Sequence, residues 1–262
     1  MLPMRSLSRA AAAIFSAAAV IGIVYFINYY QIYSFMSVKK VSFIAPDNKK
    51  ISANLFLADN PKGWLLLTHI MPETKESWNK FASDLQKSGY ESLAIDLRGH
   101  GGSEGGPGGY AEFSKEEHQA AINDLEAGWQ YLKSRGALPE KSTAIGGSIG
   151  ANLSLLFLTR HPDVGGGVLL SAGNYQGIDS AELVKRLAAN QKLLLVASKL
   201  DERTAGNNAE QNREYYNLSS QVLNRHLIIF DGAGHGTSLF ELKEEYDLER
   251  AVIKFLESGR IN

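Results

Sequence analysis

The sequence predicts an α/β fold in which a mostly parallel, twisted sheet carries helices on both faces and begins with an antiparallel hairpin. Short apolar runs rich in Leu, Ile and Val alternate with longer helix-like segments along most of the chain. Such runs are typical of strands buried on both faces, and their alternation with helices favours parallel pairing. A Gly-rich turn around Ser148 lies between one such strand and the next helix. An apolar N-terminal stretch adds one predicted transmembrane helix before the domain.

Residues 1–37 predict a membrane anchor. The stretch 10–27 is free of charged residues, and as a helix it would span about 27 Å, close to a bilayer core of about 30 Å. Arg5 and Arg9 flank its start and Tyr29 lies beyond its end. The positive-inside rule then places the N-terminus in the cytoplasm and the catalytic domain outside a single-pass cell-membrane anchor. A cleaved signal peptide and a buried core helix are the alternatives.

Residues 38–262 predict one α/β domain with a short cap at 172–191. Its first two apolar runs flank the turn sequence Pro46-Asp47-Asn48, which indicates an antiparallel hairpin. The expected strands are 41–46, 51–57, Trp64–His69, Glu91–Asp96, Ser142–Gly147, Gly166–Ser171, Lys192–Ala197 and His226–Phe230. The expected helices are Lys75–Lys87, Ser114–Arg135, Ile149–Arg160, Ser180–Asn190, Gly206–Leu218 and Ser238–Glu257.

The composition of the 262 residues excludes several classes of function. With 27 basic and 28 acidic residues, the chain offers no electrostatic basis for nucleic-acid binding. Without Cys it has no disulfide, no thiolate metal ligand and no Cys nucleophile. It contains no H-E-x-x-H, so we expect neither a metal nor a cofactor. The Gly-rich stretch 99–110 lacks the Lys of a phosphate-binding loop and predicts a mobile surface loop beside the site.

The turn around Ser148 predicts a catalytic nucleophile. Gly146, Ser148 and Gly150 form a G-x-S-x-G sequence between an apolar strand and a helix. A serine on so sharp a turn needs neighbours without side chains, and its hydroxyl then projects from the sheet edge. The following helix directs its N-terminus toward charge that develops on a reacting carbonyl. The backbone N–H of Ile149 is therefore an expected oxyanion donor.

Further segments join this turn in a resemblance to the α/β-hydrolase superfamily. They are Leu67–Met71 after a strand, the turn Asp96–Ser103, Asp201 after the strand Lys192–Ala197, and Ala233–Gly236 after the last strand. The chain is similar in particular to minimal-lid bacterial serine hydrolases of the serine-aminopeptidase-like and dienelactone-hydrolase-like groups. The resemblance covers essentially residues 38–262, and it implies a triad in the chain order Ser, Asp, His.

The resemblance assigns Ser148 as nucleophile, Asp201 as acid and His235 as base. Of the six His, only His235 follows the last strand; the plainer alternative is a loop residue in a Gly-rich turn. Asp231, just before His235, and Glu202, directly after Asp201, are the rival acids. Asp231 could instead stabilise its own turn through backbone hydrogen bonds.

The same resemblance places a second oxyanion donor in the main chain after the strand that ends at His69. The expected donor is the N–H of Ile70, where many members have Gly, and Met71 is the alternative. A backbone donor tolerates this difference, because the side chain takes no part in the hydrogen bond. We expect His69, Met71 and Tyr175 to contact the substrate, and we expect the short cap to leave the site open.

These residues predict a serine hydrolase that forms an acyl-enzyme, with a carboxylesterase acting on small or exposed acyl esters as the first choice. A thioesterase, or an aminopeptidase or amidase, would use the same triad. A peptidase that trims N-terminal residues would need acids for the free amine, and Glu73 and Glu104 are the candidates by position. A non-catalytic binding module on the same fold is the alternative outside the enzymes. The expected partners are a small ester substrate and the membrane, without nucleic acid.

Overall fold

The computed structural model describes residues 38–242 and 247–261. The predicted anchor within residues 1–37 lies outside this part of the chain, so it stays a prediction. Among the described residues, no helix has the length and apolar character needed to cross a membrane.

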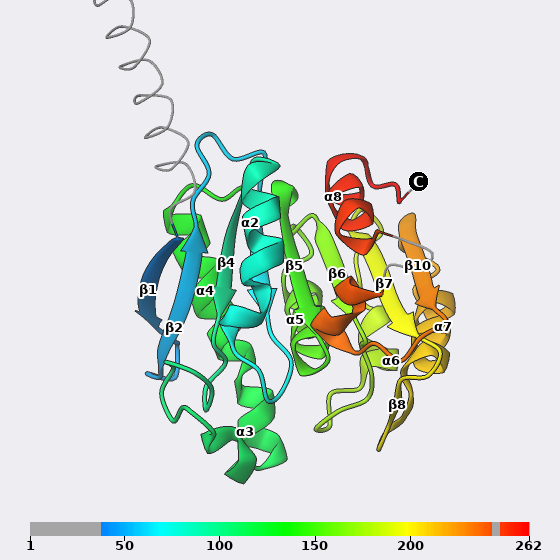
Figure 1. Cartoon of the computed structure of the whole chain (residues 1–262), viewed down its shortest axis with the longest axis horizontal. Coiled ribbons are helices and arrows are strands. Elements are labelled where there is room, and N and C mark those ends of the chain that lie inside the picture. The colour runs from blue at the N-terminus through cyan, green and yellow to red at the C-terminus, as the bar shows by residue number, and fades with distance from the viewer. Residues whose placement is uncertain (1–37, 243–246, 262) are drawn as a thin grey trace, which may run out of the picture. The chain divides into compact units, whose positions relative to one another are not determined.

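A mixed eight-stranded sheet forms the centre of the domain, in the order β1-β2-β4-β3-β5-β6-β7-β10 (Figure 1). Its strands are β1 (Val38–Ile44), β2 (Lys50–Phe56), β3 (Gly63–Thr68), β4 (Tyr90–Ile95), β5 (Ser142–Gly147), β6 (Gly166–Leu170), β7 (Lys192–Ser198) and β10 (Asn224–Phe230). β1 and β2 pair antiparallel, β2 pairs antiparallel with β4, and the remaining pairs are parallel. The expected mostly parallel sheet with an N-terminal antiparallel hairpin is confirmed.

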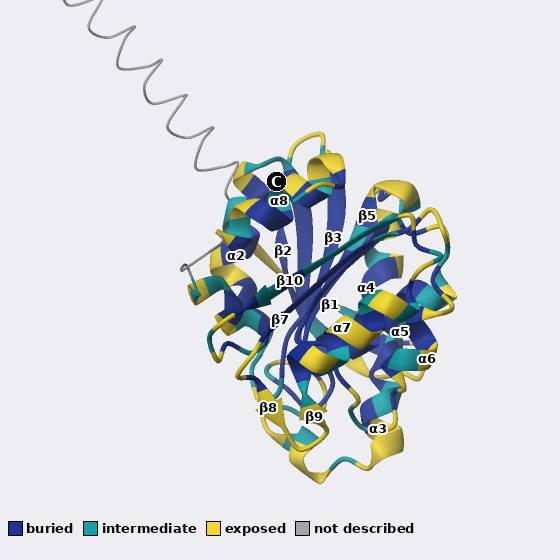
Figure 2. Ribbon diagram, turned by 90° about the vertical axis from the view of Figure 1, so that its right-hand side faces the viewer, coloured by how far each residue is buried: buried dark blue, intermediate teal, exposed yellow. Residues whose placement is uncertain are grey.

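Helices cover both faces of the sheet (Figure 2). They are α2 (Asn79–Lys87), α3 (Lys115–Ala120), α4 (Ile122–Ser134), α5 (Ile149–Arg160), α6 (Ser180–Val184), α7 (Asn208–Leu218) and α8 (Leu248–Ser258). One apolar core lies between the sheet and α4, α5, α6 and α7, and a second lies under α2 and α8. Two buried faces explain why the strands read as unbroken apolar runs.

Strand β3 shows how the sequence supplies both cores. Leu65 and Leu67 belong to the core under α2 and α8, whereas Trp64 and Leu66 belong to the core under the other helices. Successive side chains of a strand point to opposite faces, so the central positions of β3, which face two apolar cores, are all apolar. Each such side chain contributes roughly 1.5–3 kcal/mol when fully buried.

Several predicted helix limits are wrong. The helix expected over Ser180–Asn190 ends at Val184, and the one expected over Ser114–Arg135 is two helices that meet at Ala121. The helix expected from Gly206 begins at Asn208, because Gly206–Asn207 (β9) pairs with Glu202–Arg203 (β8). The helix expected over Ser238–Glu257 is in part a 3₁₀ helix at Gly236–Glu241, and α8 starts only at Leu248. Side-chain caps from Asn207 and Asp247 set two of these starts.

The stretch 99–110 is tied to the sheet by the buried carboxylate of Asp96. This carboxylate accepts hydrogen bonds from the backbone N–H of Lys75 at 2.8 Å, from Lys75 Nζ at 2.6 Å and from the N–H of Gly102 at 2.8 Å. Gly101 has a positive φ of 47°, and a Cβ there would collide with this carboxylate. The start of the stretch is therefore tied to the sheet at Asp96, and the mobility expected from its glycines stays a prediction.

Replacing Asp96 with Asn should destabilise the domain strongly. The side chain of Lys75 is only 7% exposed and Asp96 is fully buried, and removing one partner of a buried ion pair costs about 3–5 kcal/mol. The free energy of unfolding in urea measures this loss.

Replacing Lys49 with Gln is the matched control. Lys49 pairs with Glu104 on the same turn, but both side chains are more than 40% exposed, at 47% and 43%. Solvent weakens such pairs, so the urea midpoint should hardly move. An equally small effect of Asp96→Asn would contradict the anchoring role of Asp96.

Candidate active site

Ser148 sits at the sharp turn between β5 and α5. Its backbone has φ 52° and ψ −119°, a strained conformation for a residue with a side chain. A Cβ on Gly146 would collide with the carbonyl of Gly150, and a Cβ on Gly150 would collide with the carbonyl of Thr68. Both glycines are thus required by close backbone approach. The turn presents the Ser148 side chain at the carboxyl edge of the sheet.

His235 and Asp201 come together from the ends of adjacent parallel strands. Asp201 follows β7 and His235 follows β10, and Nδ1 of His235 lies 2.7 Å from Oδ2 of Asp201. Asp201 is fully buried, whereas the His235 side chain is 14% exposed. Since Nδ1 is engaged by the carboxylate, Nε2 is the ring nitrogen left for a serine hydroxyl.

Other side chains hold Asp201 in its ionised form. Asn208 Nδ2 donates to Oδ2 at 2.8 Å, and Arg203 Nε donates to Oδ1 at 2.8 Å. Burial opposes ionisation, but the hydrogen bonds from His235, Asn208 and Arg203 outweigh it and bring the pKa of Asp201 down to about 2. This value lies below the unfolded-state pKa of about 3.9. Ionised Asp201 therefore stabilises the fold above that pH, and the contribution is lost as the pH falls through about 2.

The rival acids pair with other side chains. Asp231 is 56% exposed and forms an ion pair with Lys199. Glu202 is exposed and accepts a hydrogen bond from Asn207 Nδ2 at 2.7 Å. The geometry thus pairs His235 with Asp201.

The expected oxyanion donors flank the serine turn. Ile149 is the first residue of α5, so its N–H has no carbonyl partner within the helix. The side chain of Ile70 packs on the glycines beside the triad: a Cβ on Gly147 would lie 2.6 Å from Ile70 Cγ2, and a Cβ on Gly236 would collide with it. The Ile70 side chain therefore occupies the space beside Gly147 and Gly236, and it fits there because neither glycine has a side chain.

A cavity of about 490 Å³ opens at the serine. It is lined by Met71, Ser148, Asn152, Ser171, Gly173, Asn174, Tyr175, Gln176, Arg203, Thr204, Ala205, Asn208 and His235. Two of the residues expected to contact substrate, Met71 and Tyr175, lie here, with the Tyr175 hydroxyl 4.0 Å from the Met71 sulfur. Tyr175 and its neighbours come from the short cap, so this segment forms one wall of the cavity and no residue of 99–110 lines it.

His69, also expected to contact substrate, does not line this cavity. Its ring is fully buried, with Nδ1 donating to the Ile70 carbonyl at 2.8 Å and Nε2 accepting from the Leu97 N–H at 3.0 Å. Burial and the neighbouring ring of His100 lower the pKa of His69 to about 4. The neutral ring thus joins two loops and leaves no nitrogen for a ligand.

Sequence reasoning missed Asn152, Ser171, Arg203 and Asn208. Asn152 lies one helical turn after Ser148, so its place beside the serine could have been inferred from helix periodicity. Its Oδ1 accepts from the Gly173 N–H at 3.0 Å and holds the cap loop. Ser171, Arg203 and Asn208 carry no comparable signal, because their positions depend on the course of loops after β6 and β7.

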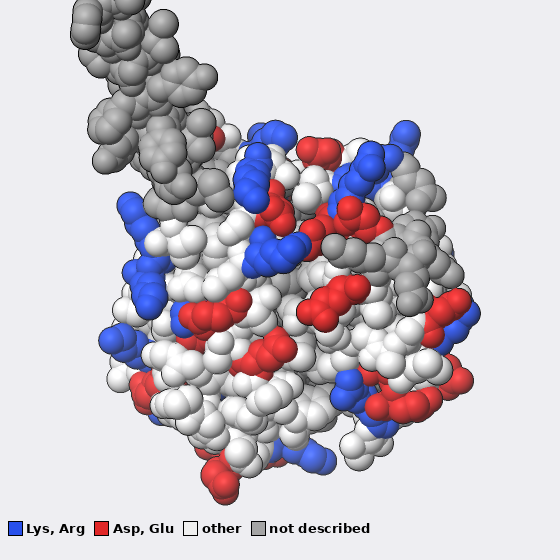
Figure 3. Space-filling view, in the orientation of Figure 1, with Lys and Arg blue, Asp and Glu red and all other residues white. Residues whose placement is uncertain are grey.

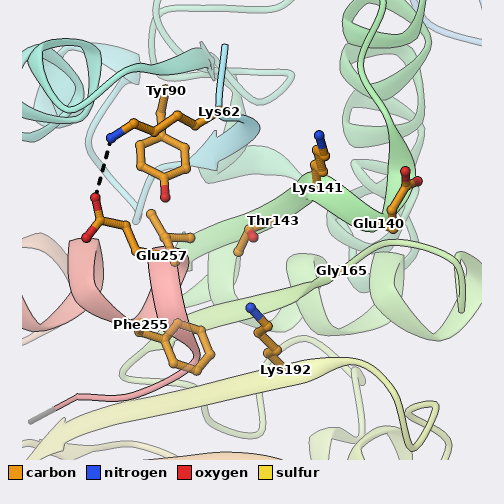
Figure 4. A pocket seen from close by; sticks show the side chains of 10 residues that line it. Lys62, Tyr90, Glu140, Lys141, Thr143, Gly165, Lys192, Phe255 and Glu257 are labelled. Atoms are coloured by element: carbon orange, nitrogen blue, oxygen red, sulfur yellow. Dashed lines mark ion pairs between the residues drawn. The ribbon is translucent and has the colours of Figure 1, made fainter.

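A second cavity of about 470 Å³ lies at the opposite edge of the sheet, where the parallel strands begin (Figure 4). Lys62, Lys141 and Lys192 project around it, and Lys62 pairs with Glu257 of α8 at 3.5 Å. It contains none of the triad residues. Ligands of open α/β sheets bind outside the carboxyl ends of the strands, so the cavity at Ser148 is the candidate active site.

Among the described residues, neither the surface charges nor the arrangement of possible metal ligands points to a second functional site. On the face shown in Figure 3, acidic and basic side chains are interspersed rather than gathered into one patch. Within residues 38–242 and 247–261, no group of three or more His, Asp or Glu side chains is arranged to hold a metal ion.

Comparison of the sequence with known proteins finds a family and a more distant relative. The family model described as serine aminopeptidase S33 matches residues 59–225. Epoxide hydrolase 3 of Xenopus tropicalis is 32% identical over 100 residues, which span 38% of this chain and only 24% of that protein.

Solved structures extend the likeness to the whole domain. An esterase of Pyrococcus furiosus superposes with a TM-score of 0.69 at 21% identity, covering 85% of this chain and 92% of that one. A thermophilic esterase of Thermogutta terrifontis gives a TM-score of 0.64 at 15% identity, covering 85% and 99%. Such low identities show the fold alone, and the predicted α/β-hydrolase fold is confirmed.

Replacing Asp201 with Asn should abolish most activity, whereas Asp231→Asn should not. The amide would favour the wrong tautomer of His235, and this change lowers kcat by about 10⁴-fold in a Ser-His-Asp hydrolase. Asp231 is the matched control, because it is an exposed Asp after the neighbouring strand. Steady-state kinetics on a chromogenic ester measure both variants. A larger loss in Asp231→Asn would refute the assignment of the acid.

Proposed function

The chain belongs to the serine aminopeptidase S33 family of α/β hydrolases, and from this premise we propose that it is a serine carboxylesterase acting on small or exposed acyl esters. The observation that carries the proposal is the pairing of His235 Nδ1 with Asp201 beside a cavity that Ser148 and His235 both line. A nucleophile, a base and an acid that fixes the base are the complete set for acyl transfer.

The reaction follows from this arrangement. Nε2 of His235 takes the proton of the Ser148 hydroxyl as its oxygen attacks the ester carbonyl. The N–H groups of Ile149 and Ile70 stabilise the oxyanion that forms, helped by the N-terminus of α5. Protonated His235 then gives its proton to the departing alcohol, which leaves an acyl group on Ser148. Water, activated by the same imidazole, hydrolyses the acyl-enzyme and restores the serine.

The lining of the cavity favours an ester over a peptide with a free N-terminus. An aminopeptidase must bind an ammonium group, and carboxylates are the side chains suited to it. None of the described residues that line the cavity is Asp or Glu, and the lining carries Arg203 instead. Of the two candidate acids, Glu104 pairs with Lys49, and Glu73 accepts from the Thr237 hydroxyl at 3.1 Å outside the cavity lining.

The short cap supports small or exposed acyl groups. Only the loop around Tyr175 and the five-residue helix α6 stand between β6 and the approach to β7. Gln119 Nε2 donates to the Gln176 carbonyl at 2.7 Å, which ties this loop to α3. A tied, short cap of this kind leaves the serine open from one side. A thioester would fit the same machinery, whereas a purely binding role would leave the paired acid and base without a purpose.

Replacing Ser148 with Ala should remove labelling by a fluorophosphonate probe and lower ester hydrolysis by several orders of magnitude. Ser154→Ala is the matched control, because Ser154 lies on the same helix and is fully buried, and its hydroxyl has no hydrogen-bond partner among the described residues. The control should keep both labelling and turnover. Parent-like activity of Ser148→Ala would disprove the nucleophile.

A substrate panel decides between the esterase and its alternatives. Chromogenic esters, thioesters and aminoacyl anilides, each corrected with Ser148→Ala, should show turnover of esters well above that of anilides. Turnover of anilides without esters would replace the esterase with an aminopeptidase, despite the absence of a lining carboxylate.

We also propose that residues 1–37 anchor the enzyme in the cell membrane, with the N-terminus in the cytoplasm and the catalytic domain outside. The uncharged stretch 10–27 and the flanking Arg5 and Arg9 support this orientation. Alkaline phosphatase fused after Asn262 should be active and should sediment with the membranes. A soluble, shortened product would show a cleaved signal peptide, and an inactive reporter would place the domain in the cytoplasm.

A further inference from the structure

In the described lining of the active-site cavity there is one cationic side chain, an arginine, and no carboxylate. Apart from the ring of His235, Arg203 is the only side chain among the described lining residues that can carry a charge. The catalytic Asp201 does not line the cavity, because it is fully buried behind His235. A substrate in this cavity therefore meets a guanidinium group and no carboxylate.

Arg203 reaches the cavity from a small antiparallel ribbon. It lies on β8, opposite Gly206 of β9, directly after the loop that carries Asp201. Its Nε donates to Asp201 Oδ1 at 2.8 Å, which fixes the plane of the guanidinium. The Arg203 side chain is 49% exposed. An arginine has donors on both terminal nitrogens besides Nε, so Arg203, a residue of the cavity lining, keeps donors beyond the one that Asp201 accepts.

Asp201 forms an ion pair with Arg203 through Oδ1 and Nε at 2.8 Å, and it shares its charge with further donors. Its other oxygen, Oδ2, accepts from Asn208 at 2.8 Å and from His235 at 2.7 Å. When His235 becomes protonated during the reaction, two cations share one carboxylate. The positive charge of Arg203 toward the cavity is then least compensated while the acyl group is being transferred.

We propose that Arg203 makes this cavity selective for small esters that carry a carboxylate at the end remote from the scissile bond. The inference rests on the proposed ester hydrolysis and narrows its substrate class. A planar guanidinium binds a carboxylate through two parallel hydrogen bonds. Asn174 and Thr204, which line the same cavity, supply neutral polar groups beside it.

Matched pairs of esters test the proposal on the full-length protein. One series consists of 4-nitrophenyl monoesters of linear dicarboxylic acids, each paired with a neutral ester in which an isopropyl group replaces the carboxylate. The second series consists of acetate esters of linear ω-hydroxy acids with the same replacement. Background hydrolysis is measured with Ser148→Ala and subtracted.

The parent protein should prefer the carboxylate member of at least one series by about tenfold or more in kcat/KM, the strength expected of a charge-assisted hydrogen bond. Arg203→Gln should bring that ratio close to one, with the larger loss on the anionic ester. Arg203→Lys should retain part of the preference, and added salt should reduce it in the parent. Arg213→Gln is the matched control: Arg213 is exposed on α7 and does not line the cavity, so the ratio should not change.

Other outcomes have distinct meanings. Equal losses on the charged and neutral esters in Arg203→Gln would show that Arg203 acts only through Asp201 and would overturn the proposal. A parent protein without preference in either series would overturn it as well. No turnover of any ester above the Ser148→Ala background would instead refute the proposed function itself.

Discussion

The close approach of the serine turn to the main chain at the end of β3 is the constraint on which the site depends. Gly150 lies against the carbonyl oxygens of Thr68 and His69, where no side chain would fit. This contact holds the strained backbone of Ser148 and brings the first N–H of α5 beside the segment that begins at Ile70. Ser148 and the N–H groups proposed as oxyanion donors are therefore placed by backbone packing, and such donors need no particular side chain.

The base side of the site depends on one carboxylate that several groups share. Asp201 receives hydrogen bonds from His235, from Asn208 at the start of α7, and from Arg203 on the β8–β9 ribbon. Each of these comes from a different local element, so the orientation of the imidazole depends on the packing of all of them. Burial of the acid costs solvation, and the shared hydrogen bonds offset it enough to keep the carboxylate ionised.

The sequence predicts most of what local rules control. Apolar runs such as Trp64–His69 locate the strands because both faces are buried, and G-x-S-x-G locates Ser148 because only glycines permit its turn. The short helices were less predictable: α6 stops at Val184 although helix-compatible residues continue. Arg203 on β8 and Asn208 at the start of α7 reach the site because of the way the chain folds after β7, which depends on tertiary packing. The ring of His69 is held by a hydrogen bond from the Leu97 N–H of another loop, which local sequence does not reveal.

Family membership and the residues of the cavity together limit the range of possible substrates more than either does alone. The family takes its description from aminopeptidases, yet the proposed nucleophile and base would serve any acyl transfer equally well. Discrimination among acyl substrates must come from groups that touch the remote part of the substrate. In the described part of this cavity those groups are neutral amides and hydroxyls, apolar Met71 and the ring of Tyr175, and the guanidinium of Arg203. An ammonium group would meet a like charge there, whereas an ester with a neutral or negatively charged end would not.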